Sequence, residues 1–306
     1  MTLTFSYANY KIFIKIIDNV GHRWDIKNKC INSVNKLLVN MSEEAIKYKS
    51  LHKDMNFENL SLAELNKLPS YNGVYDFKIS KTSFLMLNII NDDSSVVKHF
   101  WKGSHDLKEL DLWFEISKNE GVFIDVGAHT GLYTITSLKA NPKNSIVCFE
   151  PYFMNLSRLI TNLRLNGLFK NVSSVLGAVS NFDGKSKFKI TTERSYMSKG
   201  GRLSEEGQDI NVYKLDTLLF KKFEKKLNAI KIDTEGEDLN VLLGAENLIK
   251  EYKPKIIIEV REENKIDIVN FLKSNSYKIY NIKDLDNEFN FEENKIENVI
   301  NLYAKL

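Results

Sequence analysis

Cysteine and long hydrophobic runs are scarce in this sequence of 306 residues. The two cysteines, Cys30 and Cys148, belong to no CxxC or Cys/His pattern, so they indicate packed thiols in a reducing compartment. No apolar run is long enough to span a membrane. Residues 1–18 lack the uninterrupted apolar core of a signal peptide, because Lys11 and Lys15 interrupt it. We therefore expect a soluble, cytoplasmic protein.

An excess of charge of either sign is also lacking. The chain has 43 Lys and Arg against 40 Asp and Glu, a formal net charge of +3. Proteins that bind nucleic acids usually carry a strongly basic face, which this balance does not indicate. The hydrophobic fraction of 43% and the charged fraction of 27% are ordinary for a globular protein, which excludes wholesale disorder. The sequence leaves the oligomeric state open.

Residues 1–100 are expected to form an N-terminal helical and β extension, followed by a domain over residues 101–306. Helical spacing of apolar residues runs through 1–68, and Ser61 with Glu64 forms a capping box. Three short runs then predict strands, at residues 74–77, 83–90 and 96–101, before a helix over 105–119. The basic, aromatic segment 5–20 has two interpretations, a packed helix or a helix that associates weakly with a membrane surface.

From residue 122 onward, short apolar runs alternate with helical patterns. This alternation predicts an α/β fold in which a mostly parallel sheet is covered by helices on both faces. Residues 297–306 are expected to add an antiparallel edge strand, and residues 194–209 a loop over one end of the sheet. The apolar runs lie at residues 122–125, 145–150, 172–179, 229–233 and 255–259, and a helix is predicted over 237–251.

A glycine-rich turn follows the first of these runs, in the sequence Asp125-Val-Gly127-Ala-His129-Thr-Gly131. The spacing differs from the Gly-x-Gly-x-x-Gly of dinucleotide-binding turns, and no Gly-Lys-Ser/Thr follows as in a P-loop. Asp125 would repel a pyrophosphate, but it suits a cationic or amine-bearing ligand. The second run ends at Glu150, whose carboxylate is able to accept hydrogen bonds from both hydroxyls of a ribose.

These two segments resemble motif I and the following strand of class I S-adenosylmethionine-dependent methyltransferases. Further segments in the same order are similar to the FkbM-type methyltransferase domain. The resemblance covers about residues 120–262 and includes Gly177-Ala-Val-Ser180, Leu215-Asp216, Lys231-Ile-Asp233-Thr-Glu235-Gly236 and Pro254-Lys-Ile-Ile-Ile-Glu259. It implies a Rossmann-like class I methyltransferase fold with a mostly parallel seven-stranded sheet, and S-adenosyl-L-methionine as the cofactor.

The resemblance also implies roles for individual residues. The cofactor's methionine part would lie against Asp125, Gly127 and Gly131, its ribose against Glu150, and its adenine near Ala178. The methyl-transfer site would contain Asp233, Glu235 and Glu259. His129 stands where Asn is common in the family, and two roles stay open for it, a contact with cofactor or substrate and a cap of the following helix.

FkbM-type enzymes are understood to methylate hydroxyl oxygens of sugars, glycolipids and polyketides, so a small-molecule or saccharide acceptor is implied. Asp233 is the first candidate for the general base, with a helix cap as its alternative role. Glu259 is a candidate for substrate binding or for a structural hydrogen bond. Nothing in the spacing of the acidic residues demands a metal. The alternatives are a nucleic-acid methyltransferase, whose usual Pro-Pro-Tyr or Pro-Pro-Phe is absent, and a non-catalytic binding module.

Overall fold

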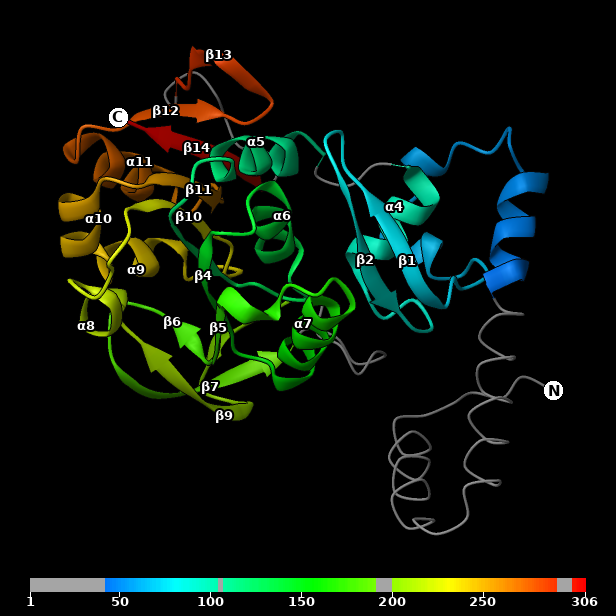
Figure 1. Ribbon diagram of the computed structural model, residues 1–306, viewed down its shortest axis with the longest axis horizontal. Coiled ribbons are helices and arrows are strands. Elements are labelled where there is room, and N and C mark those ends of the chain that lie inside the picture. Colours follow the sequence, from blue (N-terminus) through cyan, green and yellow to red (C-terminus); the bar gives the residue numbers. More distant parts are fainter. Residues whose placement is uncertain (1–41, 104–106, 191–199, 291–298) are drawn as a thin grey trace, which may run out of the picture. The chain divides into compact units, whose positions relative to one another are not determined.

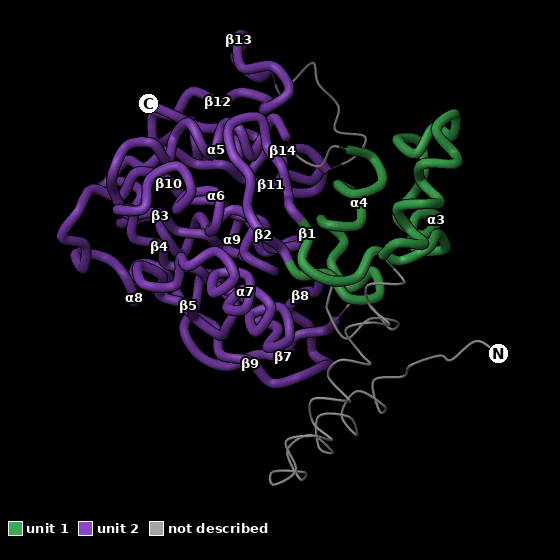
Figure 2. The backbone as a smooth tube through the Cα atoms, turned by 45° about the vertical axis from the view of Figure 1, so that its right-hand side comes forward, with its two compact units in different colours: residues 1–75, 87–103 green, residues 76–86, 104–306 purple. Residues whose placement is uncertain are grey.

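The computed structural model describes residues 42–103, 107–190, 200–290 and 299–306 (Figure 1). The chain divides into two compact units, one of residues 1–75 and 87–103 and the other of residues 76–86 and 104–306 (Figure 2). The predicted helices before residue 42, including the segment 5–20, lie outside the described residues.

The smaller unit is mainly helical. A helix at residues 42–51 is followed by η1 (Phe57–Asn59), α3 (Leu62–Leu65) and α4 (Ser94–Lys102). The predicted capping box is confirmed, since the backbone N–H of Ser61 donates to Glu64 Oε2 over 2.8 Å. The hairpin strands β1 (Gly73–Lys78) and β2 (Ser83–Asn88) pass from this unit into the larger one.

The strand predicted at residues 96–101 is wrong, because this segment lies in α4. Asp93 caps the helix by accepting hydrogen bonds from the backbone N–H groups of Ser95 and Val96. Gly103 ends it in a left-handed conformation, with φ of 73°. These two caps outweigh the strand preference of the β-branched and aromatic residues between them.

The larger unit is built on an eight-stranded sheet, as far as the described residues show, with the order β13-β12-β14-β11-β10-β3-β4-β5. Strands β3, β4, β5, β10 and β11 are parallel, as the sequence predicts. These strands are β3 (Val122–Val126), β4 (Ser145–Glu150), β5 (Val172–Leu176), β10 (Leu227–Ile232), β11 (Lys255–Val260), β12 (Lys278–Asn281), β13 (Asp284–Glu288) and β14 (Ile300–Lys305).

Two details of the predicted sheet need correction. The sheet has eight strands rather than seven, because the exposed β13 pairs with β12. Strand β14 is antiparallel as expected, but it lies between β11 and β12 instead of at the edge. Leu302, Tyr303 and Ala304 are all buried, which suits a strand with neighbours on both sides.

A smaller four-stranded sheet has the order β6-β9-β7-β8, with β6 (Ala178–Val179), β7 (Gly184–Ile190), β8 (Gly201–Ser204) and β9 (Gln208–Tyr213). The run predicted as one strand over 172–179 is therefore split at Gly177, where a side chain would meet the Tyr213 ring. The part of the predicted 194–209 loop that the structure describes is mostly strand, since β8 pairs with β7. Residues 194–199 lie outside the described parts.

Helices cover both faces of the large sheet. They are α5 (Leu107–Ser117), α6 (Leu132–Ala140), α7 (Phe153–Leu165), α8 (Leu215–Leu219), α9 (Asp238–Leu243), α10 (Glu246–Tyr252) and α11 (Lys265–Ser274), with a short η2 (Phe169–Asn171). The single helix predicted over 237–251 is two helices, because Gly244 approaches the Ser180 backbone and Asp216 caps α10 through the N–H groups of Asn247 and Leu248.

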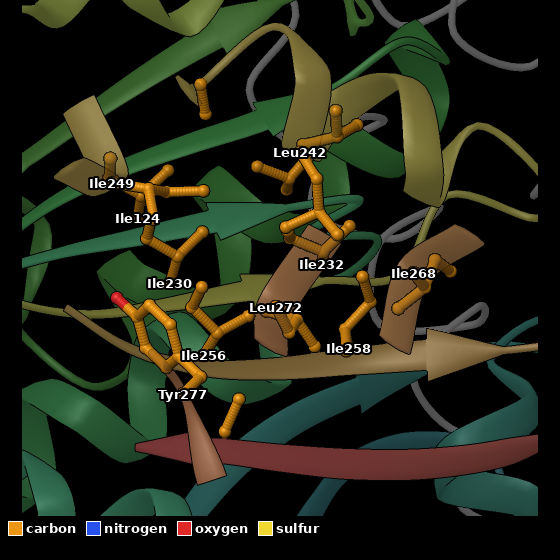
Figure 3. Close-up of a cluster of buried hydrophobic side chains, with 14 of the residues drawn as sticks. Ile124, Ile230, Ile232, Leu242, Ile249, Ile256, Ile258, Ile268, Leu272 and Tyr277 are labelled. Atoms are coloured by element: carbon orange, nitrogen blue, oxygen red, sulfur yellow. The ribbon is translucent and has the colours of Figure 1, made fainter. Parts of the chain in front are cut away.

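The alternation of the strands decides which residues meet which helices. Alternate strand residues such as Ile124, Ile230, Ile232 and Ile258 form one hydrophobic cluster with residues of α9, α10 and α11 (Figure 3). The intervening residues lie on the opposite face, where Trp113 of α5 packs edge-on against Phe123 at 5.6 Å. Asp125 and Lys231 alternate with the isoleucines and therefore belong to this second face.

Candidate active site

A row of three acidic residues and a glycine crosses four neighbouring strands at their carboxyl ends. Four buried residues are in register across β4, β3, β10 and β11. They are Cys148, Asp125, Lys231 and Ile257. Two residues further along the chain from each of these, and on the same face of the sheet, lie Glu150, Gly127, Asp233 and Glu259. We call these four residues the edge row. All four are among the site residues that the sequence analysis names.

Gly127 brings the ends of two strands close together. It has φ of 82°, and a Cβ atom there would lie 1.8 Å from the backbone oxygen of Asp233. The backbone N–H groups of Gly127 and Ala128 both donate to the Phe149 oxygen, which ties the turn to β4. Gly131, with φ of 93°, packs against Leu159, where a Cβ would lie 2.9 Å from Cγ. Both glycines are therefore required by close approach as well as by backbone conformation.

Glu150 is held in place by its own surroundings. Its Oε2 accepts from the His129 backbone N–H over 2.9 Å, and its Oε1 accepts from the Tyr152 N–H over 2.9 Å and from Asn155 over 3.3 Å. Burial raises the pKa of Glu150, and these hydrogen bonds and the His129 charge oppose that rise. The carboxylate is thus fixed at the end of β4 with its two oxygens at known positions.

His129 contributes to the turn through its backbone. The residue has a positive φ of 49°, which points its N–H toward Glu150. The N-cap residue of α6 is Gly131 and not His129. Both roles of the His129 side chain, a contact with cofactor or substrate and a cap of the helix start, stay predictions.

Asp125 lies behind the glycine turn instead of at its surface. It is 1% exposed, and its Oδ2 accepts a hydrogen bond from the Thr134 hydroxyl over 2.6 Å. Burial raises the pKa of Asp125 to about 6, while Thr134 and the Lys231 charge oppose the rise. Asp125 therefore links β3 to the first turns of α6.

Asp125→Asn is expected to change how stability depends on pH. The unfolded chain releases this proton near pH 4 and the folded chain near pH 6, so the folded state binds more protons in between. The free energy of unfolding of the wild type should fall relative to the variant as pH rises through this window. The expected change is about 2–3 kcal/mol. Urea unfolding from pH 4 to 7 measures it, and parallel curves for the two proteins would contradict the assignment.

Asp233 follows β10 and is the most exposed carboxylate of the edge row, with 38% of its side chain accessible. Its Oδ2 accepts a hydrogen bond from Lys231 Nζ over 3.1 Å. Asp238, the first residue of α9, holds the turn before this helix by accepting from the backbone N–H groups of Thr234 and Gly236. Asp238 is a residue that sequence reasoning missed, and the N-cap residue of α9 is Glu237 rather than Asp233.

Glu259 and Glu235 meet at an arginine. Arg261 Nη2 lies 2.6 Å from Glu259 Oε1 and 2.6 Å from Glu235 Oε2. Burial and the charges of Asp233 and Asp238 raise the pKa of Glu259 to about 8, against the opposing charge of Arg261. Glu235 lies in the turn before α9, with φ of 57°.

Ala178 is held near Glu150 by the residue that precedes it, Gly177. The N–H of its neighbour Gly177 donates to the backbone oxygen of Glu150 over 3.2 Å. Ala178 is 8% exposed and packs in a cluster with Phe188 and Val212. In the described parts of the chain, no three His, Cys, Asp or Glu side chains are gathered as a metal ion would need.

Comparison with known proteins assigns this sequence to a family. Residues 125–279, more than half of the chain, match the family described as the methyltransferase FkbM domain. The chain belongs to the FkbM methyltransferase family. Every member of the edge row lies within the matched segment, and the predicted Rossmann-like class I methyltransferase fold is confirmed by the match and the sheet order. No curated protein matches the sequence.

Three solved structures illustrate the similarity of this FkbM-family chain to others. The methyltransferase FkbM from Methylobacillus flagellatus KT is 17% identical, with 70% of this chain and 54% of that chain covered and a TM-score of 0.44. This chain thus spans about half the length of that protein. TYW2 from M. jannaschii, in complex with AdoMet, is 16% identical, with 78% and 86% covered and a TM-score of 0.42. A ribosomal protein L11 methylase from Lactobacillus delbrueckii subsp. bulgaricus is 12% identical, with 64% and 78% covered and a TM-score of 0.38.

Proposed function

We propose that this FkbM-family chain is an S-adenosylmethionine-dependent O-methyltransferase whose acceptor is a hydroxyl of a sugar, a glycolipid or a similar metabolite. The observation that carries the proposal is the edge row, in which Gly127 stands between the carboxylates of Glu150 and Asp233. Ligands of open α/β sheets bind beyond the carboxyl ends of the strands, which is where this row lies.

The residues on one side of Gly127 fit the cofactor. The Glu150 carboxylate has about four lone-pair sites and accepts three hydrogen bonds within the protein, so one site remains for a ribose hydroxyl. Bound there, the cofactor supplies an electrophilic methyl group on a sulfonium. Its methionine part would lie against Gly127, His129 and Gly131, with Asp125 supporting the turn from behind, and its adenine near Ala178.

The residues on the other side of Gly127 fit the acceptor. Asp233 Oδ2 is engaged by Lys231, and the half-exposed carboxylate is able to take the proton of an acceptor hydroxyl. Glu259 and Glu235, joined through Arg261, would hold neighbouring hydroxyls and so orient the reacting oxygen. Lys231 and Arg261 are both paired with carboxylates here, which supports an uncharged acceptor over the phosphate backbone of a nucleic acid.

Two measurements test the proposed function. Isothermal titration should detect binding of S-adenosylmethionine to the full chain, and a radiolabelled methyl group should pass to at least one member of a panel of neutral saccharides. Single-stranded RNA and DNA serve as comparison acceptors. Methylation of nucleic acid alone would replace the proposed acceptor class, and the absence of cofactor binding would leave a non-catalytic module on this fold.

Glu150→Ala is expected to weaken S-adenosylmethionine binding by about 1.5–3 kcal/mol, roughly 10- to 150-fold in Kd, because a charged hydrogen-bond acceptor is lost. Calorimetry measures the difference. Glu246→Ala is the matched control, since this glutamate pairs with Lys250 on the surface of α10. Equal affinities in the wild type and Glu150→Ala would remove Glu150 from the ribose site.

A further inference from the structure

A buried lysine stands directly below the edge row. Lys231 belongs to β10, where it is in register with Asp125 of β3 and Ile257 of β11, and its side chain is 1% exposed. The residues before and after it, Ile230 and Ile232, belong to the hydrophobic cluster on the opposite face. Lys231 therefore places an ammonium group inside the unit, between the sheet and its helices.

Three groups surround this ammonium. Lys231 Nζ lies 3.1 Å from Asp233 Oδ2 and 3.3 Å from Oε1 of Glu109, whose side chain is 6% exposed. It also lies 4.9 Å from the centre of the Tyr133 ring on α6. Burial lowers the pKa of Lys231, but the charges of Asp233 and Glu109 outweigh it and hold the pKa above its ordinary value. Lys231 is thus a fixed cation and not a proton acceptor.

A buried ion pair is an unfavourable way to fill the space between the sheet and its helices. Taking a charge out of water costs several kcal/mol, and apolar side chains of similar volume often serve stability as well as a buried ion pair does. The ion pair has one property that an apolar side chain lacks, because it fixes the direction of a carboxylate. Asp233 comes two residues after Lys231, just beyond the end of β10, so the lysine contacts the aspartate from the buried side.

We propose that Lys231 is a positioning residue that holds Asp233 in the edge row, and that Glu109 anchors Lys231 from α5. The proposal rests on the proposed function, in which Asp233 receives the acceptor proton. Lys231 occupies Oδ2 and turns Oδ1 toward the acceptor side. Because α5 precedes the matched residues 125–279, a helix outside the family segment takes part in building the site.

The test compares crystal structures and thermal unfolding of the full chain for the wild type, Lys231→Met, Glu109→Gln and the double variant. In Lys231→Met, the Asp233 carboxylate should lose its single orientation and the unfolding temperature should fall, because the buried Glu109 loses the charge of Lys231. The double variant should recover most of that temperature loss, since both charges are gone. It should not recover the orientation of Asp233.

Lys225→Met is the matched control, because Lys225 pairs with Glu120 at the surface. It should change neither the orientation of Asp233 nor, beyond about a degree, the unfolding temperature. If Lys231→Met does not fold, the double variant alone carries the structural test. The proposal is overturned if Asp233 keeps its wild-type orientation in either variant that lacks Lys231, or if its orientation recovers together with stability.

A kinetic arm uses the best saccharide acceptor from the panel. Turnover of the double variant should fall by ~10- to 10²-fold at an unchanged KM for the cofactor, as for a misplaced reacting group. Adding Asp233→Asn to it should lower turnover no further than Asp233→Asn alone, and additive losses would contradict the proposal. The crystal structures need no acceptor, so a failure of the methyl-transfer assay would count against the proposed function and not against the positioning of Asp233.

Discussion

Asp233→Asn is expected to lower methyl transfer by at least ~10²-fold while leaving S-adenosylmethionine affinity unchanged. The amide keeps the shape of the side chain, and its oxygen is able to accept from Lys231 in place of Oδ2. Its NH₂ group then faces the acceptor side, where it is unable to take a proton. Turnover with the best saccharide acceptor measures the first effect, and calorimetry of cofactor binding measures the second.

Asp216→Asn is the matched control for this experiment. It makes the same chemical change at an aspartate outside the edge row, whose oxygens accept from the N–H groups of Asn247 and Leu248 at the start of α10. This variant should lose some stability and keep its turnover. Near-normal turnover in Asp233→Asn would instead assign Asp233 the structural role of orienting the chain after β10.

The edge row is visible in the sequence for a simple physical reason. Each of its members comes at or just after the end of an apolar run, and parallel strands present their carboxyl ends at one edge of the sheet. The turn after β3 was recognisable because Asp125, Gly127 and Gly131 have residue types that a tight, close-packed turn requires. Position along the chain therefore predicted which residues share the edge.

The side-chain contacts of these residues could not be predicted from the sequence. Lys231 interrupts an apolar run, which signals nothing about whether its side chain turns outward or is buried, and its ion pair with Glu109 exists only because α5 covers this face. Strand β13 has no buried residue, so it lacks the alternation that predicts a strand. In α4 a signal was present, since Asp93 and Gly103 are suitable helix caps, but the β-branched and aromatic residues between them obscured it.

Gly127→Ala is expected to cost at least ~4 kcal/mol in the free energy of unfolding and to abolish cofactor binding. The new Cβ would lie 1.8 Å from the Asp233 backbone oxygen, so β3 and β10 would have to separate at their carboxyl ends. That movement would break the hydrogen bond from the Asp233 N–H to the Val126 oxygen, now 3.0 Å long. Urea unfolding and calorimetry measure the two effects.

Gly167→Ala separates the close approach at Gly127 from the cost of its backbone conformation. Gly167 also has a positive φ, 68°, but a Cβ there would meet nothing within 4 Å. Its replacement should therefore cost only about 1–2 kcal/mol, the penalty of a left-handed conformation, and leave cofactor binding intact. Equal losses for the two variants would mean that the ends of β3 and β10 have room to part, and the edge row would then not be the rigid base of the site.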